Sequence, residues 1–135
     1  MRARTDDGTL HIGEVAERVG LSLRTVRYYE EQGLFEPAGR TEGGFRLYTD
    51  REVDRLLLIK QMKPLGFTVQ EMRELLAAHD ALAGDDAGRR RDAERRMAEF
   101  AGQAAERCHE LREQLARAEE FARRLSAHAP RRSGG

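Results

Sequence analysis

Apolar residues near the start of the chain recur at helical spacing, and glycines interrupt the pattern. After residues 1–10, which we expect to form a flexible leader, one helical face is made by Ile12, Val15, Ala16 and Val19. Gly20 ends this helix, because glycine accepts the left-handed backbone of a helix C-terminus. Ser22 can cap a second helix, which runs to about Gln32 before Gly33. Two short helices around a glycine turn predict a helix-turn-helix.

The next segment, residues 35–48, has the turn residues and the alternation of a β-hairpin. Pro37 and Gly39 precede a Gly43-Gly44 pair. The run that follows this pair is Phe45-Arg46-Leu47-Tyr48. A glycine pair between short alternating runs favours a tight turn between two strands. We therefore expect a small wing beside the helix-turn-helix.

Two capping boxes mark the starts of the next two helices. The first joins Thr49 to Glu52, and the second joins Thr68 to Glu71. We expect the second of these helices to extend through Leu76. The buried side of the first is expected to consist of Val53, Leu56, Leu57, Ile59 and Met62.

The last third of the chain predicts one long helix. After a polar break at residues 83–88, one helix is expected as far as about His128, and its apolar or small residues alternate at spacings of four and three from Met97 to Leu125. These seam positions are Met97, Ala101, Ala104, Cys108, Leu111, Leu115, Ala118, Ala122 and Leu125. Phe100 and Phe121 lie beside the seam positions that hold small alanine side chains. They are expected to widen the surface that the coiled coil buries. The pattern predicts a coiled coil of about 40 Å at 1.5 Å per residue. Cys108 would then be a small buried residue of the seam, with a redox sensor as the alternative.

These patterns divide the chain into four parts. We expect a winged helix-turn-helix domain at residues 10–78, a linker at 79–88, a dimerisation helix at 89–128 and a disordered tail at 129–135. A chain of 135 residues suits one small core with an extension rather than two full cores.

Composition limits the class of protein. The formal net charge is zero although 36% of the residues are charged. Phosphate recognition remains open, because it needs a local basic surface and not a basic total. The charged N-terminal residues do not resemble a signal peptide, and no window is apolar enough to span a membrane, so we expect a cytoplasmic protein.

The most informative stretch is residues 22–30, on the second helix of the predicted helix-turn-helix. Leu23, Val26 and Tyr29 are expected to face the core. Arg24, Arg27 and Tyr28 would then project outward. Arginine can bind both acceptors of a guanine in the major groove, and a tyrosine hydroxyl can hold a phosphate. Without other motifs, a solvated helix face with charge pairs explains the same residues.

Several linked motifs, in order, resemble the N-terminal winged domain of the MerR family of regulators over about residues 11–76. They are Ile12-Gly13-Glu14-Val15-Ala16, Thr25-Val26-Arg27-Tyr28-Tyr29-Glu30, Gly33-Leu34, Gly44-Phe45-Arg46-Leu47-Tyr48 and Leu65-Gly66-Phe67. The resemblance implies a mostly α fold in which a winged helix-turn-helix domain precedes a long helix that dimerises as an antiparallel coiled coil. It also implies that a homodimer binds a palindromic promoter site in double-stranded DNA and distorts it, with RNA polymerase as an indirect partner.

The resemblance implies specific DNA contacts. By motif they are Arg24, Thr25, Arg27 and Tyr28 on the recognition helix, Arg40, Arg46 and Tyr48 in the wing, and Lys63 on the next helix. The family's metal sensors carry cysteines at the start of the dimerisation helix, where this chain has Ala77-Ala78-His79. With Cys108 as the one cysteine of the sequence, we expect no metal site.

Two other functions remain open. One is a DNA-architectural protein of the excisionase type, which uses a similar winged domain without regulating a promoter directly. The other is a coiled-coil interaction protein with a vestigial DNA-binding domain. An enzyme is not expected, and no cofactor is expected, because the sequence has no phosphate-binding glycine loop, spaced metal cluster or nucleophile motif.

Overall fold

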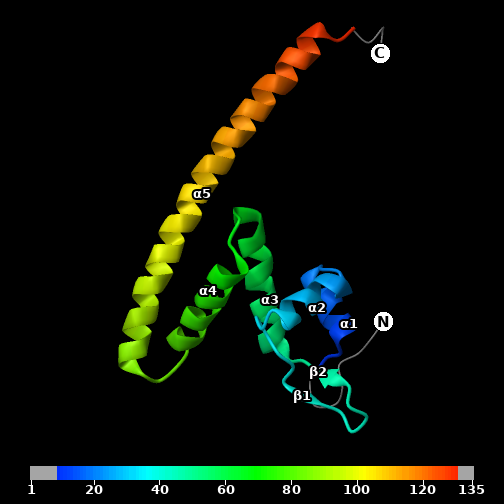
Figure 1. Ribbon diagram of the computed structural model, residues 1–135, viewed down its shortest axis with the longest axis vertical. Coiled ribbons are helices and arrows are strands. Elements are labelled where there is room, and N and C mark those ends of the chain that lie inside the picture. The colour runs from blue at the N-terminus through cyan, green and yellow to red at the C-terminus, as the bar shows by residue number, and fades with distance from the viewer. Residues whose placement is uncertain (1–8, 131–135) are drawn as a thin grey trace. The chain divides into compact units, whose positions relative to one another are not determined.

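The computed structural model describes residues 9–130, which are mostly helical (Figure 1). In chain order the elements are α1 (Ile12–Val19), α2 (Leu23–Glu31), β1 (Gly39–Arg40), β2 (Arg46–Leu47), α3 (Asp50–Met62), the 3₁₀ helix η1 (Lys63–Leu65), α4 (Val69–Leu82) and α5 (Ala87–His128). An N-terminal unit ends at Ala98, and a C-terminal unit begins at Glu99 within α5. The predicted fold class, a helical chain with a two-stranded wing and a long last helix, is confirmed.

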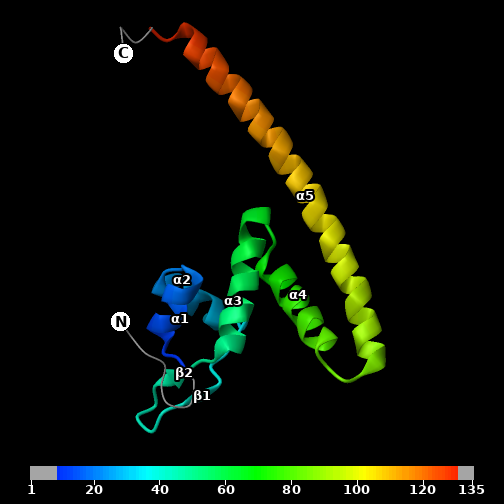
Figure 2. The same cartoon turned by 180° about the vertical axis from the view of Figure 1, so that it is seen from behind.

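A glycine turn joins α1 to α2, as predicted. Gly20 has a φ of 70°, and the Lys60 ammonium donates to the Val19 carbonyl beside it at 2.7 Å. The Ser22 hydroxyl accepts a hydrogen bond of 3.1 Å from the Thr25 amide and so caps α2. α1 packs against both α2 and α3, which fixes the angle of the second helix (Figure 2).

Two residues that were expected to be buried are partly exposed. Leu23 and Leu57 are each 38% exposed. Six residues of helix rotate by about 600°, so the side chains of Leu23 and Tyr29 lie about 120° apart. Because Val26 and Tyr29 are buried, Leu23 lies at the edge of the core. Leu57 follows the fully buried Leu56, about 100° further around α3, and is therefore turned outward.

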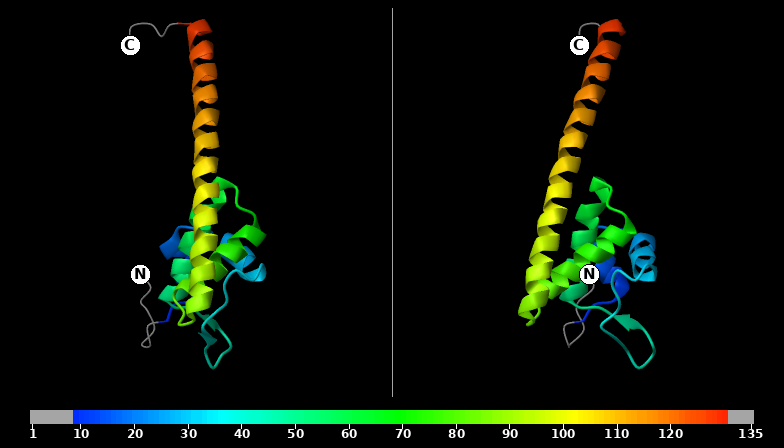
Figure 3. Two further views of the ribbon diagram at one scale, coloured as in Figure 1. Left: turned by 90° about the vertical axis from the view of Figure 1, so that its left-hand side faces the viewer. Right: turned by 60° about the vertical axis from the view of Figure 1, so that its left-hand side comes forward.

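The predicted wing is present, and the chain before α1 joins it. β1 and β2 pair antiparallel, and their hairpin extends away from the helices of the N-terminal unit (Figure 3). Leu10 and Tyr48 exchange backbone hydrogen bonds of 2.7 and 2.8 Å. The predicted leader is therefore wrong at its end, because strand pairing holds Leu10 in the core. Residues 1–8 of that leader lie outside the described residues.

The core of the N-terminal unit draws on every α-helix of that unit and on the loops between them. Both predicted capping boxes are confirmed, at Thr49 with Glu52 and at Thr68 with Glu71. They set the starts of α3 and α4 and so the faces that these helices bury. The buried apolar residues are Leu10, Val15, Ala16, Val19, Val26, Tyr29, Leu34, Phe35, Tyr48, Val53, Leu56, Ile59, Met62, Phe67, Met72, Leu76, Ala78 and Ala93.

The break before the long helix is shorter than the predicted linker at 79–88. α4 continues to Leu82 and α5 begins at Ala87. Residues 77–82 are rich in alanine and leucine, which favour a helix. Asp80 also accepts a hydrogen bond of 2.6 Å from Arg55, which ties the last turn of α4 to α3. The Asp86 carboxylate accepts from the Arg89 amide at 2.9 Å and caps α5.

In the C-terminal unit, large apolar side chains of α5 are exposed in the single chain. Leu111 is 42% exposed, and Leu115, Phe121 and Leu125 are each more than half exposed. Phe100 is only 3% exposed in the single chain, and its place in the dimer strip stays a prediction. Of the predicted tail, residues 131–135 lie outside the described residues. No helix within residues 9–130 is long and apolar enough to cross a membrane.

We expect the Gly20→Ala substitution to lower the free energy of unfolding by about 1–2 kcal/mol, since a side chain is strained at positive φ. The added Cβ would also lie 2.9 Å from the Lys60 Nζ atom. Gly13→Ala is the matched control, because a Cβ there meets nothing within 4 Å. Inside α1 it should stabilise the protein by about 0.5–1 kcal/mol. Urea unfolding measures both, and a Gly20→Ala protein as stable as the wild type contradicts this account of the turn.

Candidate nucleic-acid interface

The outer face of α2 presents the side chains that were predicted to read DNA. Arg24, Arg27 and Tyr28 are exposed, and Tyr28 retains 46% of its surface. Thr25 is half-buried, and its hydroxyl accepts from Ser22 at 2.9 Å within the cap. Neither Arg24 nor Arg27 forms an ion pair with a described residue, so both guanidinium groups are available to an anion.

A shallow hollow of about 310 Å³, open to solvent, joins this helix to the wing and to the start of α1. It is lined by His11, Ile12, Arg27, Arg40, Gly44, Phe45 and Arg46. Three guanidinium groups thus surround one concave surface, and guanidinium binds phosphate with two parallel hydrogen bonds. The hollow therefore has the chemistry of a site for the phosphates of a nucleic acid.

Tyr48 does not belong to this surface, so its predicted contact with DNA is wrong. Its side chain is fully buried, with the ring centroid 5.9 Å from that of Phe35. Its hydroxyl donates a hydrogen bond to the Glu30 carboxylate. Burial and, after it, this carboxylate raise the pKa of the Tyr48 phenol. Tyr48 lies one residue beyond β2, and the alternation in the sequence did not show that its side chain meets Glu30.

The remaining basic residues that were predicted to contact DNA, Arg40, Arg46 and Lys63, have different surroundings. Arg46 is 46% exposed at its side chain and forms an ion pair of 3.0 Å with Glu30. Arg40 is exposed, and its guanidinium donates to the Gly44 carbonyl at 3.1 Å across the turn of the wing. Lys63 is also exposed, but it begins η1 and does not line the hollow. The structure therefore brings Arg40 and Arg46 together with α2 and leaves Lys63 apart from them.

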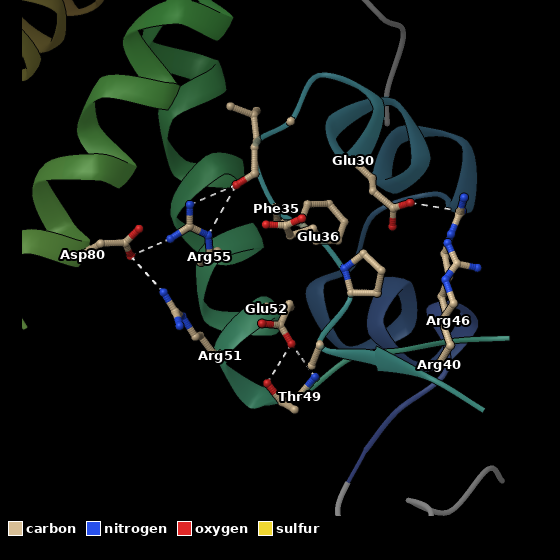
Figure 4. Close-up of a pocket in the computed structure, with 14 residues that line it drawn as sticks. Glu30, Phe35, Glu36, Arg40, Arg46, Thr49, Arg51, Glu52, Arg55 and Asp80 are labelled. Atoms are coloured by element: carbon tan, nitrogen blue, oxygen red, sulfur yellow. Dashed lines mark hydrogen bonds and ion pairs between the residues drawn. The ribbon is translucent and has the colours of Figure 1, made fainter. Parts of the chain in front are cut away.

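Two arginines from other helices hold the turn that follows α2. Arg55 donates to the Leu34 carbonyl at 3.1 and 3.3 Å while it pairs with Asp80 (Figure 4). Arg73 donates to the Gln32 carbonyl at 2.5 Å. These contacts fix the C-terminal end of α2 against α3 and α4, and sequence reasoning did not identify them because the partners are backbone carbonyls.

An ion pair also joins α4 to the first turns of α5. Arg96 donates to the Glu74 carboxylate. This hydrogen bond, with a weaker one from Gln70, holds the pKa of Glu74 below its usual value. The pair links two helices of the N-terminal unit, because both partners precede Glu99.

The described residues contain no group of three or more histidine, cysteine or acidic side chains placed to hold a metal ion. Cys108 is half-buried on α5. The exposed face of α2 and the hollow beside it present guanidinium and phenol groups, which suit an anionic polymer.

Two family models match the chain. The model described as "MerR HTH family regulatory protein" matches residues 10–79, and the model described as "MerR, DNA binding" matches residues 53–128. Together they cover the winged unit and the long helix.

Similar proteins agree with these matches. The mercuric resistance operon regulatory protein of Bacillus cereus is 48% identical over 69 residues, which are 51% of this chain and 52% of that protein. The heavy metal-dependent transcription regulator 2 of Rhizobium meliloti is 34% identical over 116 residues, 86% of this chain and 71% of that protein. The chain spans about half the length of several relatives that it matches.

A solved structure shares the fold. It is HiNmlR, a MerR family regulator lacking the sensor domain, bound to promoter DNA. It has a TM-score of 0.67 and 26% sequence identity, and the match covers 88% of each chain. With two matching family models and a relative that is similar over most of its length, this chain belongs to the MerR family of helix-turn-helix regulatory proteins.

Proposed function

We propose that this protein is a transcription regulator of the MerR type that binds a palindromic promoter site in double-stranded DNA as a homodimer and distorts it. The observation that carries the proposal is the hollow in which Arg27 of the recognition helix meets Arg40 and Arg46 of the wing. The similar protein HiNmlR is bound to promoter DNA in its structure. The protein would act by binding rather than by catalysis, in the cytoplasm, with RNA polymerase as an indirect partner.

The geometry suits two kinds of DNA contact. Arg24, Arg27 and Tyr28 lie on the exposed face of α2, which can enter a major groove and contact base edges. Arg40 and Arg46 lie beside that helix and can bind phosphates that flank the groove. Bending the DNA costs a few kcal/mol, and the additional backbone contacts of the bent state offset this cost.

The exposed apolar side chains of α5 support the homodimer. Leu111, Leu115 and Leu125 follow the predicted seam and remain exposed in one chain. A second copy of the helix would cover them, and pairing through heptads aligns two such seams. A palindromic site has two equal halves, one for each winged unit of a dimer. When one unit is bound, the linked second unit is present at a high effective concentration beside the other half.

Arg24→Ala and Arg27→Ala should each weaken binding by about 1–3 kcal/mol at a guanine and relax specificity there. Lys63→Ala should instead weaken all duplexes similarly and lower the salt dependence. The duplex is first selected from a random library with the wild-type protein, and titrations then use this duplex and its single-base variants at several salt concentrations. Wild-type affinity in both arginine variants would contradict the proposed docking of α2 in the major groove. DNA binding by the wild-type protein without any effect on transcription would favour the architectural alternative.

Leu115→Asp should produce monomers that keep the winged unit folded but bind the operator at least about a hundredfold more weakly, because the second unit no longer adds effective concentration. Ala116→Asp is the matched control, since this exposed residue lies outside the seam. Sedimentation and gel shift on the same samples measure both properties. A monomeric Leu115→Asp protein with wild-type affinity for the full site argues against the homodimer as the binding species.

Copper, zinc and mercury ions at sub-micromolar free concentration should change neither DNA binding nor transcription. Soft metal ions prefer paired thiolates, and this sequence contains Cys108 as its one cysteine. Two relatives are named for mercuric resistance and for heavy-metal dependence, so the expectation separates this chain from them. Calorimetry with the wild type and with Cys108→Ser tests it, and a tight stoichiometric site that is absent from the variant contradicts it.

A further inference from the structure

Two arginines of the wing face one another across its short pair of strands. Arg40 and Arg46 are cross-strand partners in the antiparallel register. Like charges directly opposite one another destabilise a strand pair. Arg40 turns one guanidinium nitrogen to the Gly44 carbonyl. An anion beside Arg46 would offset the repulsion and so stabilise the wing.

Glu30, at the end of the recognition helix, supplies that anion (Figure 4). Its side chain is only 13% exposed, and its Oε2 atom lies 3.0 Å from Nη1 of Arg46. Its other oxygen, Oε1, accepts the hydrogen bond from the Tyr48 hydroxyl. A single carboxylate of α2 therefore contacts Arg46 of β2 and Tyr48 just after this strand.

Tyr48 makes this contact rigid. Its backbone is paired with Leu10 on one side and its ring packs near Phe35 on the other. The fully buried Tyr48 side chain has one favourable position. Moving it would break the hydrogen bond to Glu30 and leave a buried polar group unpaired, which costs free energy. The carboxylate of Glu30 is thus held from the buried side and faces Arg46 on the exposed side.

We infer that Glu30 is a positioning residue, which fixes the guanidinium of Arg46 relative to the recognition helix so that the wing meets DNA phosphate in one orientation. Glu30 is mostly buried and carries the same charge as phosphate, so it would not bind the DNA backbone itself. It binds Nη1 of Arg46, whose planar guanidinium carries further donors, and Arg46 also lines the hollow with Arg27 and Arg40. This inference rests on the proposed function. It adds Glu30 as the residue that fixes the position of Arg46, the proposed phosphate contact, relative to the recognition helix.

The first test is a double-mutant cycle with Glu30→Ala, Arg46→Ala and the combined variant, using the duplex selected by the wild-type protein. Glu31→Ala is the matched control, because Glu31 is the exposed neighbour on the same helix. If Glu30 acts through Arg46, each single variant should weaken binding about tenfold or more, and the combined variant should be no weaker. The salt slope should fall by about 0.9 for each phosphate that the protein no longer neutralises, or about two for a dimer.

Other results overturn the inference. Additive effects of the two substitutions, or a Glu30→Ala protein with the wild-type salt slope, indicate a residue that only supports the fold. Stronger binding in Glu30→Ala indicates a carboxylate that merely repels phosphate. Glu30→Gln keeps an acceptor for Tyr48 but removes the charge, so it provides a folded variant if Glu30→Ala unfolds, and its salt slope should fall by the same amount.

A second test needs no DNA and separates this inference from the proposed function. Amide hydrogen exchange of the wing is followed at Ala38 and Thr41, whose amides donate to the Leu47 and Phe45 carbonyls at 2.8 Å. Glu30→Ala should speed this exchange about tenfold while the amides of α3 keep their protection, and Glu31→Ala should change neither. Unchanged wing exchange overturns the role of Glu30 even if the protein binds DNA. A wild-type protein that selects no duplex overturns the proposed function, and the exchange measurement still decides whether Glu30 positions the wing.

Discussion

The buried side chain of Tyr48 is the contact on which the arrangement of the winged unit depends. Its backbone pairs with Leu10, its ring lies near Phe35, and its hydroxyl donates to Glu30. These partners come from the chain before α1, the loop after α2 and the recognition helix. One residue thus joins three segments that no local preference would bring together, and a hairpin of two-residue strands gains a fixed place beside α2.

Charge is distributed in a way that a zero net total conceals. The carboxylates of Glu30, Asp80 and Glu74 each hold an arginine within the N-terminal unit. Their ion pairs leave Arg24 and Arg27 on the exposed face of α2 without an acidic partner among the described residues. A neutral chain can therefore present a local basic surface, because the arginines on the exposed face of α2 are not paired with its acidic residues.

Local features were predictable from the sequence, and long-range ones were not. The glycine turn at Gly20 and the two capping boxes depend on residues within a few positions of one another, so their patterns identified them. The burial of Leu10 and Tyr48 depends on a partner far along the chain. The burial of Leu23 was predicted wrongly for a geometric reason. Leu23 and Tyr29 are six residues apart, and residues at that spacing do not share one face of a helix. The candidate site also combines local and long-range features. The family motif contained Glu30, but the role of its carboxylate depends on contacts with Arg46 and Tyr48, which lie far from it in the sequence.

The turn of the wing, residues 41–45, is held by hydrogen bonds within the hairpin. The Thr41 amide donates to the Phe45 carbonyl, the Phe45 amide donates to the Thr41 hydroxyl, and the Arg40 guanidinium of β1 donates to the Gly44 carbonyl. Because loop length adds little to the cost of closing a loop, a longer or shorter turn can be accommodated without disturbing Tyr48. The reach of the wing along the proposed DNA backbone can therefore vary while Tyr48 keeps the base of the hairpin beside α2.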